Sequence, residues 1–260
     1  MLITTWNVNS LTVRLDQVLN YITAKNIDIL CLQETKTTNE KFPVKAFTDL
    51  NYHCIYSGEK TYNGVAIISK DKLEFTSNSL TQYPQTESKR FLAANFNNKE
   101  NKNTTIINVY IPNGQEIDSE KYIYKMEWLS QLQAYLNKNH NHDERIILLG
   151  DFNIAPGDLD VFNPNQTSDS IMTSTAERSM YEEILQWGFI DLFREQHKES
   201  SEFSWWDYRN FSFKRNLGYR IDLILGTKNI YKNLIDIYID KEPRKNDRPS
   251  DHTPVTLEIE

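Results

Sequence analysis

Residues 145–153 read RIILLGDFN, an apolar run that leads directly into two polar side chains. Branched and Leu side chains without polar alternation predict a strand covered on both faces. Gly150 is expected to let the backbone leave the sheet, which places Asp151 and Asn153 at the carboxyl end of that strand. In an extended segment these two side chains point the same way, so they could address one ligand. Asp and Asn are also ordinary turn formers, so a plain loop is the alternative.

Further apolar runs alternate with a smaller number of helical patterns. Strands are expected at residues 2–8, 27–32, 52–56, 64–69, 91–96, 104–110, 203–208, 219–225, 235–239 and 253–259. Helices are expected at residues 12–24, with Ser10 or Thr12 as the cap, and at 119–139 and 177–187, with a polar loop at 156–175. Several strands follow one another without a helix between them. This order predicts an α/β fold in which two mixed sheets pack together, with helices outside, and no linker or repeat divides the single domain of residues 1–260.

Composition places the chain among globular proteins. Its 260 residues are 39% hydrophobic, which is enough for a large core. No apolar run approaches the ~20 residues that span a bilayer, and the N-terminus lacks the pattern of a signal peptide. Cys31 and Cys54 lie in apolar surroundings typical of buried thiols, which fits a reducing compartment. We therefore expect a cytoplasmic protein that does not bind membranes.

The charge of the chain gives two opposing indications about a nucleic-acid partner. A net charge of −7 argues weakly against a polyanion, since phosphate binding needs clustered Lys and Arg. The local field matters more than the average, and residues 205–220 carry four basic side chains against Asp207 alone. These four are Arg209, Lys214, Arg215 and Arg220, and a second cluster consists of Lys241, Arg244, Lys245 and Arg248. Charged solvated faces are common, so the clusters by themselves are only a hint.

Polar side chains that could bind metal or phosphate stand at the ends of the expected strands. They are Asn7, Glu34, Tyr110, Asp151, Asn153, Asp222, Asp251 and His252. Strand ends converge at one edge of a compact α/β fold, so these residues could share a site, although each alone also fits a turn or a core edge. No Cys/His cluster suggests zinc. Hard oxygen ligands instead predict Mg²⁺, with Mn²⁺ as a substitute.

Asp222 is harder to explain as a structural residue, because it stands between apolar neighbours in an expected strand. A buried carboxylate needs a partner, and a nearby His252 would provide one. A carboxylate-paired imidazole at a phosphate site can orient a nucleophile or stabilise charge on phosphoryl oxygens.

Five motifs also carry a family resemblance. They are QETK at 33–36, GDFNIAP at 150–156, SWWDYR at 204–209, GYRIDL at 218–223 and SDHTPV at 250–255. In this order, and over essentially the whole chain, they resemble the exodeoxyribonuclease III family of abasic-site endonucleases, within the endonuclease/exonuclease/phosphatase superfamily. The resemblance implies a four-layered α/β sandwich. It also implies metal-dependent hydrolysis of duplex DNA 5′ of abasic sites, with 3′-to-5′ exonuclease and 3′-end-trimming activity, by a monomer that binds abasic sites or 3′ ends.

The resemblance also implies roles for individual residues at the reacting phosphate. Glu34 is expected to be a metal ligand and Asp251 a candidate second one. Asn7 and Asn153 would contact the scissile phosphate and Tyr110 would support it. Asp151 would transfer a proton, in a direction left open, and the Asp222–His252 pair would complete the site.

Substrate contacts follow from the same resemblance. Trp205 is expected in the substrate pocket, although Trp in a strand is usually core, and Trp206 is expected to pack. Arg90 with Lys89 and Asn113 occupy positions that could contact the DNA backbone. Backbone contacts are also expected from Arg209, Lys214 and Arg215, because these basic residues follow Trp205 in the sequence. The loop at 159–177 holds no Lys or Arg, whereas relatives often place basic residues there, so the strength of the duplex grip and the balance of activities stay open.

Two alternatives remain at this point. A phosphatase or sphingomyelinase of the same superfamily would use this chemistry on a lipid but has no use for the Trp205 segment. A catalytically inactive, nucleic-acid-associated regulatory relative would not need all of the polar strand-end residues to be intact.

Overall fold

The computed structural model describes residues 1–81, 88–97, 103–167 and 169–260, and the strands of this part form two six-stranded sheets. The first sheet has the order β11-β12-β1-β2-β4-β3. Its strands are β1 (Leu2–Asn7), β2 (Ile29–Gln33), β3 (His53–Ser57), β4 (Val65–Ser69), β11 (Leu234–Ile239) and β12 (Val255–Ile259). Only β1 and β2 run parallel, so the sheet is mixed.

The second sheet is built in the same way, with the order β5-β6-β7-β8-β10-β9. Its strands are β5 (Glu74–Ser77), β6 (Phe91–Asn97), β7 (Asn103–Tyr110), β8 (Ile146–Asp151), β9 (Phe189–Asp191) and β10 (Asp222–Thr227). Here β7 and β8 are the parallel pair, and the other neighbours are antiparallel.

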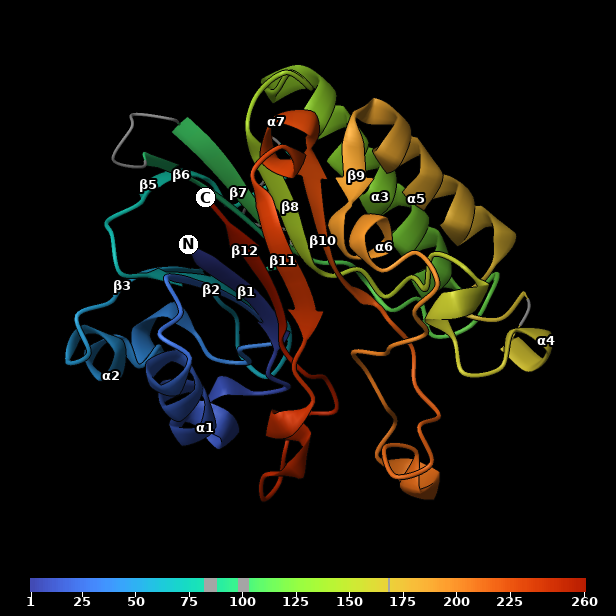
Figure 1. The fold of residues 1–260 in the computed structure, drawn as a ribbon, viewed down its shortest axis with the longest axis horizontal. Helices are drawn as coiled ribbons and strands as arrows, with labels where there is room; N and C mark the ends of the chain where they lie inside the picture. The colour runs from blue at the N-terminus through green and yellow to red at the C-terminus, as the bar shows by residue number, and fades with distance from the viewer. Residues whose placement is uncertain (82–87, 98–102, 168) are drawn as a thin grey trace.

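The helices of the described residues surround the two sheets. They are α1 (Leu11–Ala24), α2 (Val44–Thr48), α3 (Glu120–Asn139), α4 (Pro164–Thr167), α5 (Thr175–Trp187), α6 (Leu192–Gln196) and α7 (Lys228–Tyr231). Short 3₁₀ turns are η1 (Asn39–Lys41), η2 (Asp158–Asp160), η3 (Arg209–Phe211) and η4 (Glu242–Lys245). Figure 1 shows α1 and α2 against the first sheet and α3 and α5 against the second. The helices of the described residues are too short or too polar to cross a bilayer.

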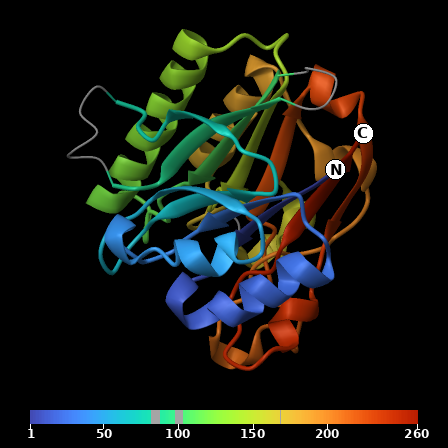
Figure 2. The same cartoon turned by 90° about the vertical axis from the view of Figure 1, so that its left-hand side faces the viewer.

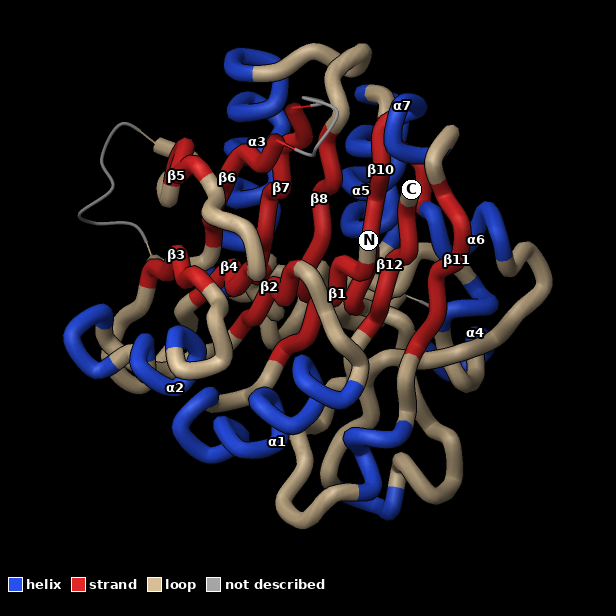
Figure 3. Tube along the Cα trace, turned by 60° about the vertical axis from the view of Figure 1, so that its left-hand side comes forward, coloured by secondary structure: helices blue, strands red, loops and turns tan. Residues whose placement is uncertain are grey.

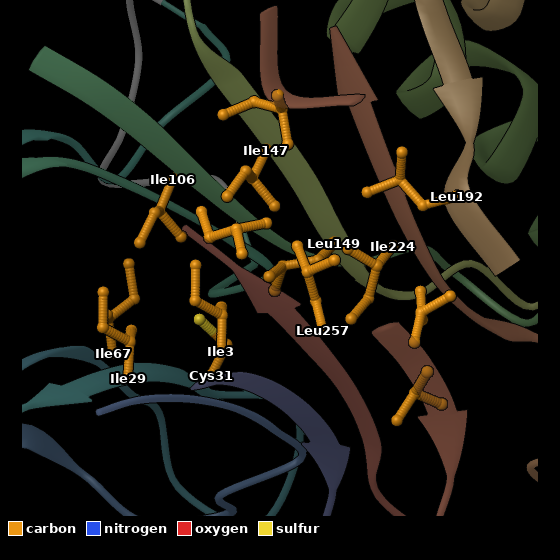
Figure 4. Close-up of a cluster of buried hydrophobic side chains, with 14 of the residues drawn as sticks. Ile3, Ile29, Cys31, Ile67, Ile106, Ile147, Leu149, Leu192, Ile224 and Leu257 are labelled. Atoms are coloured by element: carbon orange, nitrogen blue, oxygen red, sulfur yellow. The ribbon is translucent and has the colours of Figure 1, made fainter. Parts of the chain in front are cut away.

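The alternating side chains of β8 show why its sequence lacks polar alternation. Ile147 and Leu149 point into the core between the sheets, together with Ile3, Cys31 and Leu257 (Figure 4). Ile146 and Leu148 point the other way, into the core beneath α3 and α5. A third core lies between the first sheet and α1 with α2. The predicted α/β fold with two packed mixed sheets and outer helices, arranged in four layers, is therefore confirmed.

The two chain ends lie side by side in the first sheet (Figure 2). The amino group of Met1 donates a hydrogen bond of 2.6 Å to the carbonyl oxygen of Ile259. β12 pairs with β1 in antiparallel register, with Leu2 opposite Glu258. This pairing draws the segment before β12, which contains Asp251 and His252, towards the carboxyl end of β1.

Gly150 does not let the backbone leave the sheet, which corrects the prediction. It lies within β8, paired with Val109 of β7 and Leu223 of β10. Its φ is +141°, and a Cβ at this position would lie 1.9 Å from the carbonyl oxygen of Val109. The glycine is needed because the backbone of β7 approaches too closely for a side chain.

The strand expected at residues 203–208 is wrong. Within the described residues this segment forms only isolated bridges, from Trp205 to Tyr219 and to His252. Its aromatic side chains contact distant parts of the chain instead of neighbours in a ladder: Trp206 is fully buried and packs edge-on against Phe213 at 5.0 Å. The packing role expected for Trp206 is therefore confirmed.

Other boundaries also differ from the predictions. The strand expected at 219–225 begins at Asp222, so this carboxylate opens β10 instead of interrupting it. The polar loop expected at 156–175 contains η2 and α4. Ser10 lies at the N-cap position of α1, but its side chain makes no capping hydrogen bond. By contrast, Ser119 caps α3 as its position suggests, accepting from the N–H of Tyr122.

Candidate active site

The register of the second sheet places three predicted site residues next to one another. Asp151, the last residue of β8, lies opposite Tyr110 of β7 on one side and Asp222 of β10 on the other. β10 is antiparallel to β8, so its first residue meets the carboxyl end of β8. The first sheet contributes Asn7 at the end of β1 and Glu34 just after β2.

Asn7 joins the two sheets at this edge. Its fully buried side-chain amide donates to Oε1 of Glu34 at 2.9 Å and to Oδ2 of Asp151 at 2.8 Å. Its own oxygen accepts from the backbone N–H of Asn9 at 2.9 Å. One amide group thus fixes the spacing between two carboxylates that come from different sheets.

His252 forms the cationic side of the site. Its Nδ1 lies 2.8 Å from Oδ2 of Asp222, and its Nε2 lies 3.8 Å from Oδ2 of Asp151. All three side chains are nearly inaccessible to solvent. Asp222 is held in turn, because its backbone N–H donates to the hydroxyl of Ser204 at 3.0 Å. The predicted partnership of Asp222 with His252 is therefore present in the structure.

Burial and the neighbouring charges have opposing effects on the pKa values of Asp151, His252 and Glu34. Burial raises the pKa of the Asp151 carboxyl well above its usual range, and the His252 cation only partly offsets this. Burial alone would lower the pKa of His252, but Asp222 and Asp151 raise it, so the imidazole stays protonated at neutral pH. Burial also opposes charge on Glu34, yet Lys36 and the Asn7 amide outweigh it and lower the pKa of Glu34.

A metal ion fits the donors of this cluster. Among the described residues, Glu34, Asp151 and His252 offer ligand atoms within 4.8 Å of one another. Their carboxylate oxygens are the hard donors that Mg²⁺ prefers. His252 is a poor ligand here because Nδ1 faces Asp222 and the ring holds a proton. Glu34 and Asp151 are therefore the residues that would hold the ion. Asp251, expected as a second ligand, is outside this group.

Tyr110 lies beside the acidic cluster, and Arg90 covers its ring. The Arg90 guanidinium lies 4.3 Å from the ring centroid and donates to the carbonyl oxygen of Tyr110 at 3.2 Å. Burial, followed by the charge of Glu34, raises the pKa of the Tyr110 hydroxyl well above its usual value. The hydroxyl therefore stays a hydrogen-bond donor across the neutral range.

Asn153 does not continue β8 in an extended conformation, which corrects the expectation that its side chain would point with that of Asp151. Its φ is +50°, and its backbone N–H donates to Oδ1 of Asp151 at 2.9 Å. Such a local turn is typical of Asp followed by a left-handed residue. The Asn153 side chain accepts from Asn113 at 3.0 Å and donates to the carbonyl of Ile111 at 3.0 Å, so the structure brings Asn113 and Asn153 together.

Beneath these two asparagines lies a buried ion pair that the sequence did not reveal. Lys125 of α3 and Glu177 of α5 are fully buried and in contact. The Lys125 ammonium also donates to the carbonyl of Asn153 at 2.7 Å and to that of Asn113 at 3.3 Å. Glu177 completes the capping box of α5 with Ser174. The only signal in the sequence was the position of Lys125 in the helix expected at 119–139, three residues after Tyr122 and four before Leu129.

Replacing Lys125 with Met should lower the free energy of unfolding by about 3–5 kcal/mol, because Glu177 would be left as an uncompensated buried charge. Urea denaturation would measure the loss, with Lys121→Met on the exposed face of α3 as the control. Adding Glu177→Gln to Lys125→Met should recover part of the stability. A double variant less stable than Lys125→Met would contradict this account.

Trp205 and Asp251 are in direct contact. The indole N–H of Trp205 donates to Oδ2 of Asp251 at 3.0 Å. The ring is part-buried, with Tyr219 5.6 Å and His252 6.4 Å away, measured between centroids. Trp205 thus lies next to the cationic side of the site, as expected of a pocket residue.

Three of the expected DNA-backbone contacts, Arg209, Lys214 and Arg215, lie on a loop that projects beside the site. The segment from α6 to β10 and the segment from β11 to β12 extend from the same end of the molecule (Figure 3). Lys214 and Arg215 are exposed, whereas Arg209 pairs with Asp207 at 2.6 Å. In the second basic cluster Arg244 is buried, with its guanidinium 4.9 Å from the ring of Phe213, so it adds little to the surface field.

Comparison with known proteins agrees with this geometry. The model of the endonuclease/exonuclease/phosphatase family matches residues 4–252. The chain is 31% identical to exodeoxyribonuclease III of Haemophilus influenzae, over 98% of each protein. A solved 3′ phosphatase from Neisseria, bound to a product DNA hairpin, superposes with a TM-score of 0.94 at 41% identity over 100% of this chain and 99% of that one. An AP endonuclease from Archaeoglobus fulgidus gives 0.93 at 35% identity, with the same coverage.

Proposed function

Because the chain belongs to the exodeoxyribonuclease III family, within the endonuclease/exonuclease/phosphatase superfamily, and is a DNA repair nuclease, we propose that it hydrolyses duplex DNA 5′ of abasic sites. We propose further that the same site trims 3′ ends and removes nucleotides in the 3′-to-5′ direction. The observation that carries this is the single amide of Asn7, which ties Glu34 to Asp151 beside the Asp222–His252 pair. The two relatives described as a 3′ phosphatase and an AP endonuclease support both activities.

In the proposed reaction the scissile phosphate lies against Asn153 and Tyr110. Asn7, expected from the sequence to contact the phosphate, is fully buried and already bonded to Glu34 and Asp151, so it holds these two carboxylates instead. The His252 imidazolium faces the phosphoryl oxygens and stabilises the charge that develops on them. A water attacks phosphorus in line with the 3′ oxygen, which leaves as the P–O3′ bond breaks. The attacking water loses one proton and the leaving 3′ oxygen gains one, and the carboxyl group of Asp151 either accepts the first or supplies the second. Asp222 keeps the imidazole oriented and charged.

A divalent ion, Mg²⁺ or Mn²⁺, would be held by Glu34 and Asp151 and would polarise the phosphoryl oxygens. The residues around it set the rest of the geometry: Lys36 lies 2.8 Å from Oε2 of Glu34, and Asn7 donates to Oε1. These contacts orient the Glu34 carboxylate before any ion binds.

Glu34→Gln should raise the Mg²⁺ concentration for half-maximal cleavage by ~10-fold or more, since even outer-shell changes cost 10–100-fold in metal affinity. Activity should recover partly at high Mg²⁺, because an amide oxygen is a weaker ligand than a carboxylate. Mg²⁺ titrations of single-turnover cleavage would measure the shift, with the exposed Glu40→Gln as the control. A Glu34→Gln titration curve that superimposes on that of the wild type would remove Glu34 from the metal site.

The proposed function is tested with a duplex that carries one tetrahydrofuran abasic analogue, with and without EDTA. We expect a nick 5′ of the analogue that leaves a 3′-hydroxyl and requires the metal. A duplex with a recessed 3′ end and one with a 3′-phosphate would measure the end-processing activities in parallel. The absence of a metal-dependent nick at the analogue, with trimming of 3′ ends retained, would restrict the function to end processing. Inactivity on all three substrates would favour a regulatory relative.

The variants Trp205→Ala and Lys214→Ala should separate recognition of the abasic site from binding of the DNA backbone. Trp205→Ala should lose about 1–3 kcal/mol of stacking at the abasic site without changing the salt dependence of binding. Lys214→Ala should flatten that salt dependence by about one counterion and keep discrimination between abasic and intact duplex. Binding titrations at several salt concentrations would measure both quantities. If Trp205→Ala weakens both duplexes equally, recognition lies elsewhere.

We propose a monomer in the cytoplasm, where the duplex substrate is available. The lipid-directed alternative is less favoured because the exposed segment beside the site carries Lys214 and Arg215 together with a half-buried indole, which suits a nucleic acid.

A further inference from the structure

The carboxylate of Asp251 accepts hydrogen bonds from the side chains of two different segments. Oδ2 accepts from the indole N–H of Trp205 at 3.0 Å, and Oδ1 accepts from the amide of Asn9 at 2.9 Å. The backbone around it is paired as well, since the N–H of Trp206 donates to the carbonyl of Asp251 at 3.0 Å. A metal ion would therefore have to share a carboxylate oxygen with one of these donors, and Asp251 is outside the group of described residues whose ligand atoms lie within 4.8 Å of one another.

Asn9 continues this connection towards the acidic cluster. Its side-chain oxygen accepts from the ammonium of Lys36 at 2.5 Å, and the same ammonium lies 2.8 Å from Glu34. Trp205, Asp251, Asn9, Lys36 and Glu34 thus form an unbroken chain of polar contacts. The chain runs from the aromatic face beside the site to the carboxylate that would hold the metal.

The indole of Trp205 depends on Asp251 for its orientation. The backbone of Trp205 pairs with Tyr219 through two hydrogen bonds of 2.9 Å, which fix the main chain but leave the side-chain torsions free. The neighbouring rings of Tyr219 and His252 are both tilted by 58° and do not stack on the indole. Within the described residues, the bond to Asp251 is the polar contact that sets the direction of the indole edge.

We propose that Asp251 is a positioning residue for Trp205 and not a metal ligand, and that it fixes the indole plane at a set distance from Glu34. This inference rests on the proposed role of Trp205 in abasic-site recognition. Its consequence is that Asp251 sets the register between the damaged nucleotide and the phosphate to be cleaved. Asn9 belongs to none of the sequence motifs, but it connects Asp251 to Lys36 and so helps to fix the same distance.

The first test does not depend on activity. Trp6, Trp128 and Trp206 are buried, so Trp187→Phe leaves Trp205 as the one partly exposed tryptophan in the described chain. In this background Asp251→Leu should increase acrylamide quenching, because leucine offers the indole N–H no acceptor and the indole edge is released. Asp207→Leu, on the same loop but paired with Arg209, should leave quenching unchanged. Unchanged quenching in Asp251→Leu would overturn the proposal, whether or not the protein cleaves abasic DNA.

The second test is a double-mutant cycle on the binding of tetrahydrofuran duplex and intact duplex in EDTA. Asp251→Leu should reduce the preference for the abasic duplex by about 10-fold, the loss expected for one charge-assisted hydrogen bond. Trp205→Phe keeps the ring but lacks the N–H, so Asp251→Leu should add little in that background. Additive losses would overturn the proposal, as would an Mg²⁺ titration of Asp251→Leu shifted as far as that of Glu34→Gln. If wild type shows no preference for the abasic duplex, the proposed substrate fails while the quenching result still decides the role of Asp251.

Discussion

Asp151→Asn should fold normally and lower the single-turnover rate of abasic-duplex cleavage by about 10²–10⁴-fold, the range expected for loss of a proton-transfer group. The amide matches the carboxylate in size, and its remaining oxygen can still accept either the Asn7 amide or the N–H of Asn153. It cannot take up or release the proton at neutral pH. The fold should tolerate the change because burial already disfavours charge at this position.

The design of this measurement separates chemistry from binding. Because Asp151 would also hold the metal ion, rates are taken at saturating enzyme and at an Mg²⁺ concentration that saturates the variant. The dissociation constant for the duplex in EDTA is measured separately. Asp158→Asn, at an exposed carboxylate paired with Arg178, is the matched control. A well-folded Asp151→Asn that turns over within a few-fold of the wild-type rate would take Asp151 out of proton transfer. A loss confined to duplex affinity would have the same consequence.

The sequence predicted the architecture well where one element is recognisable from its own residues. The unbroken apolar run of β8 indicated a strand buried on both faces, and its side chains do divide between two cores. The partnership of Asp222 with His252 could also be predicted, because a carboxylate among apolar residues requires a nearby donor.

What could not be predicted depends on contacts between distant segments. Trp205 and Trp206 look like strand residues, but antiparallel bridges to Tyr219 and His252 and contacts with Phe213 determine their conformation. The left-handed turn at Asn153 follows from its hydrogen bonds to Asp151 and Ile111.

Asn9 and Lys125 show the same limit at the level of single side chains. Asn9 carries no local signal, yet it joins Asp251 to Lys36 across the two ends of the chain. Lys125 reads as one polar residue on a helix, and its importance appears only when Glu177 and the carbonyl of Asn153 are brought to it. The role of a residue that positions other site residues depends on its contact partners, and a single sequence does not show which distant residues those partners are.

His252→Asn should reduce the cleavage rate by about 10²–10³-fold, the cost of removing one preorganised group that stabilises a developing oxyanion. Asparagine can place its amide near the position of Nδ1 and keep a donor on Asp222, so the buried carboxylate retains a partner. The cation at Nε2, 3.8 Å from Asp151, is lost. Duplex affinity should change far less than the rate, because the group acts chiefly on charge that develops in the transition state.

Substitution of Asp222, the partner of His252, provides a second and independent test of this role. Asp222→Asn in the wild-type background should also lower the rate, since the imidazole loses the charge that orients it and keeps it protonated. In the His252→Asn background the same change should cost little, because Asp222 acts on the phosphate only through the ring. Cleavage rates are compared for the wild type, the two single variants and the double variant, and urea denaturation confirms that each protein is folded. If the two losses multiply, Asp222 contacts the reacting groups on its own and the assignment of the pair as one unit is wrong.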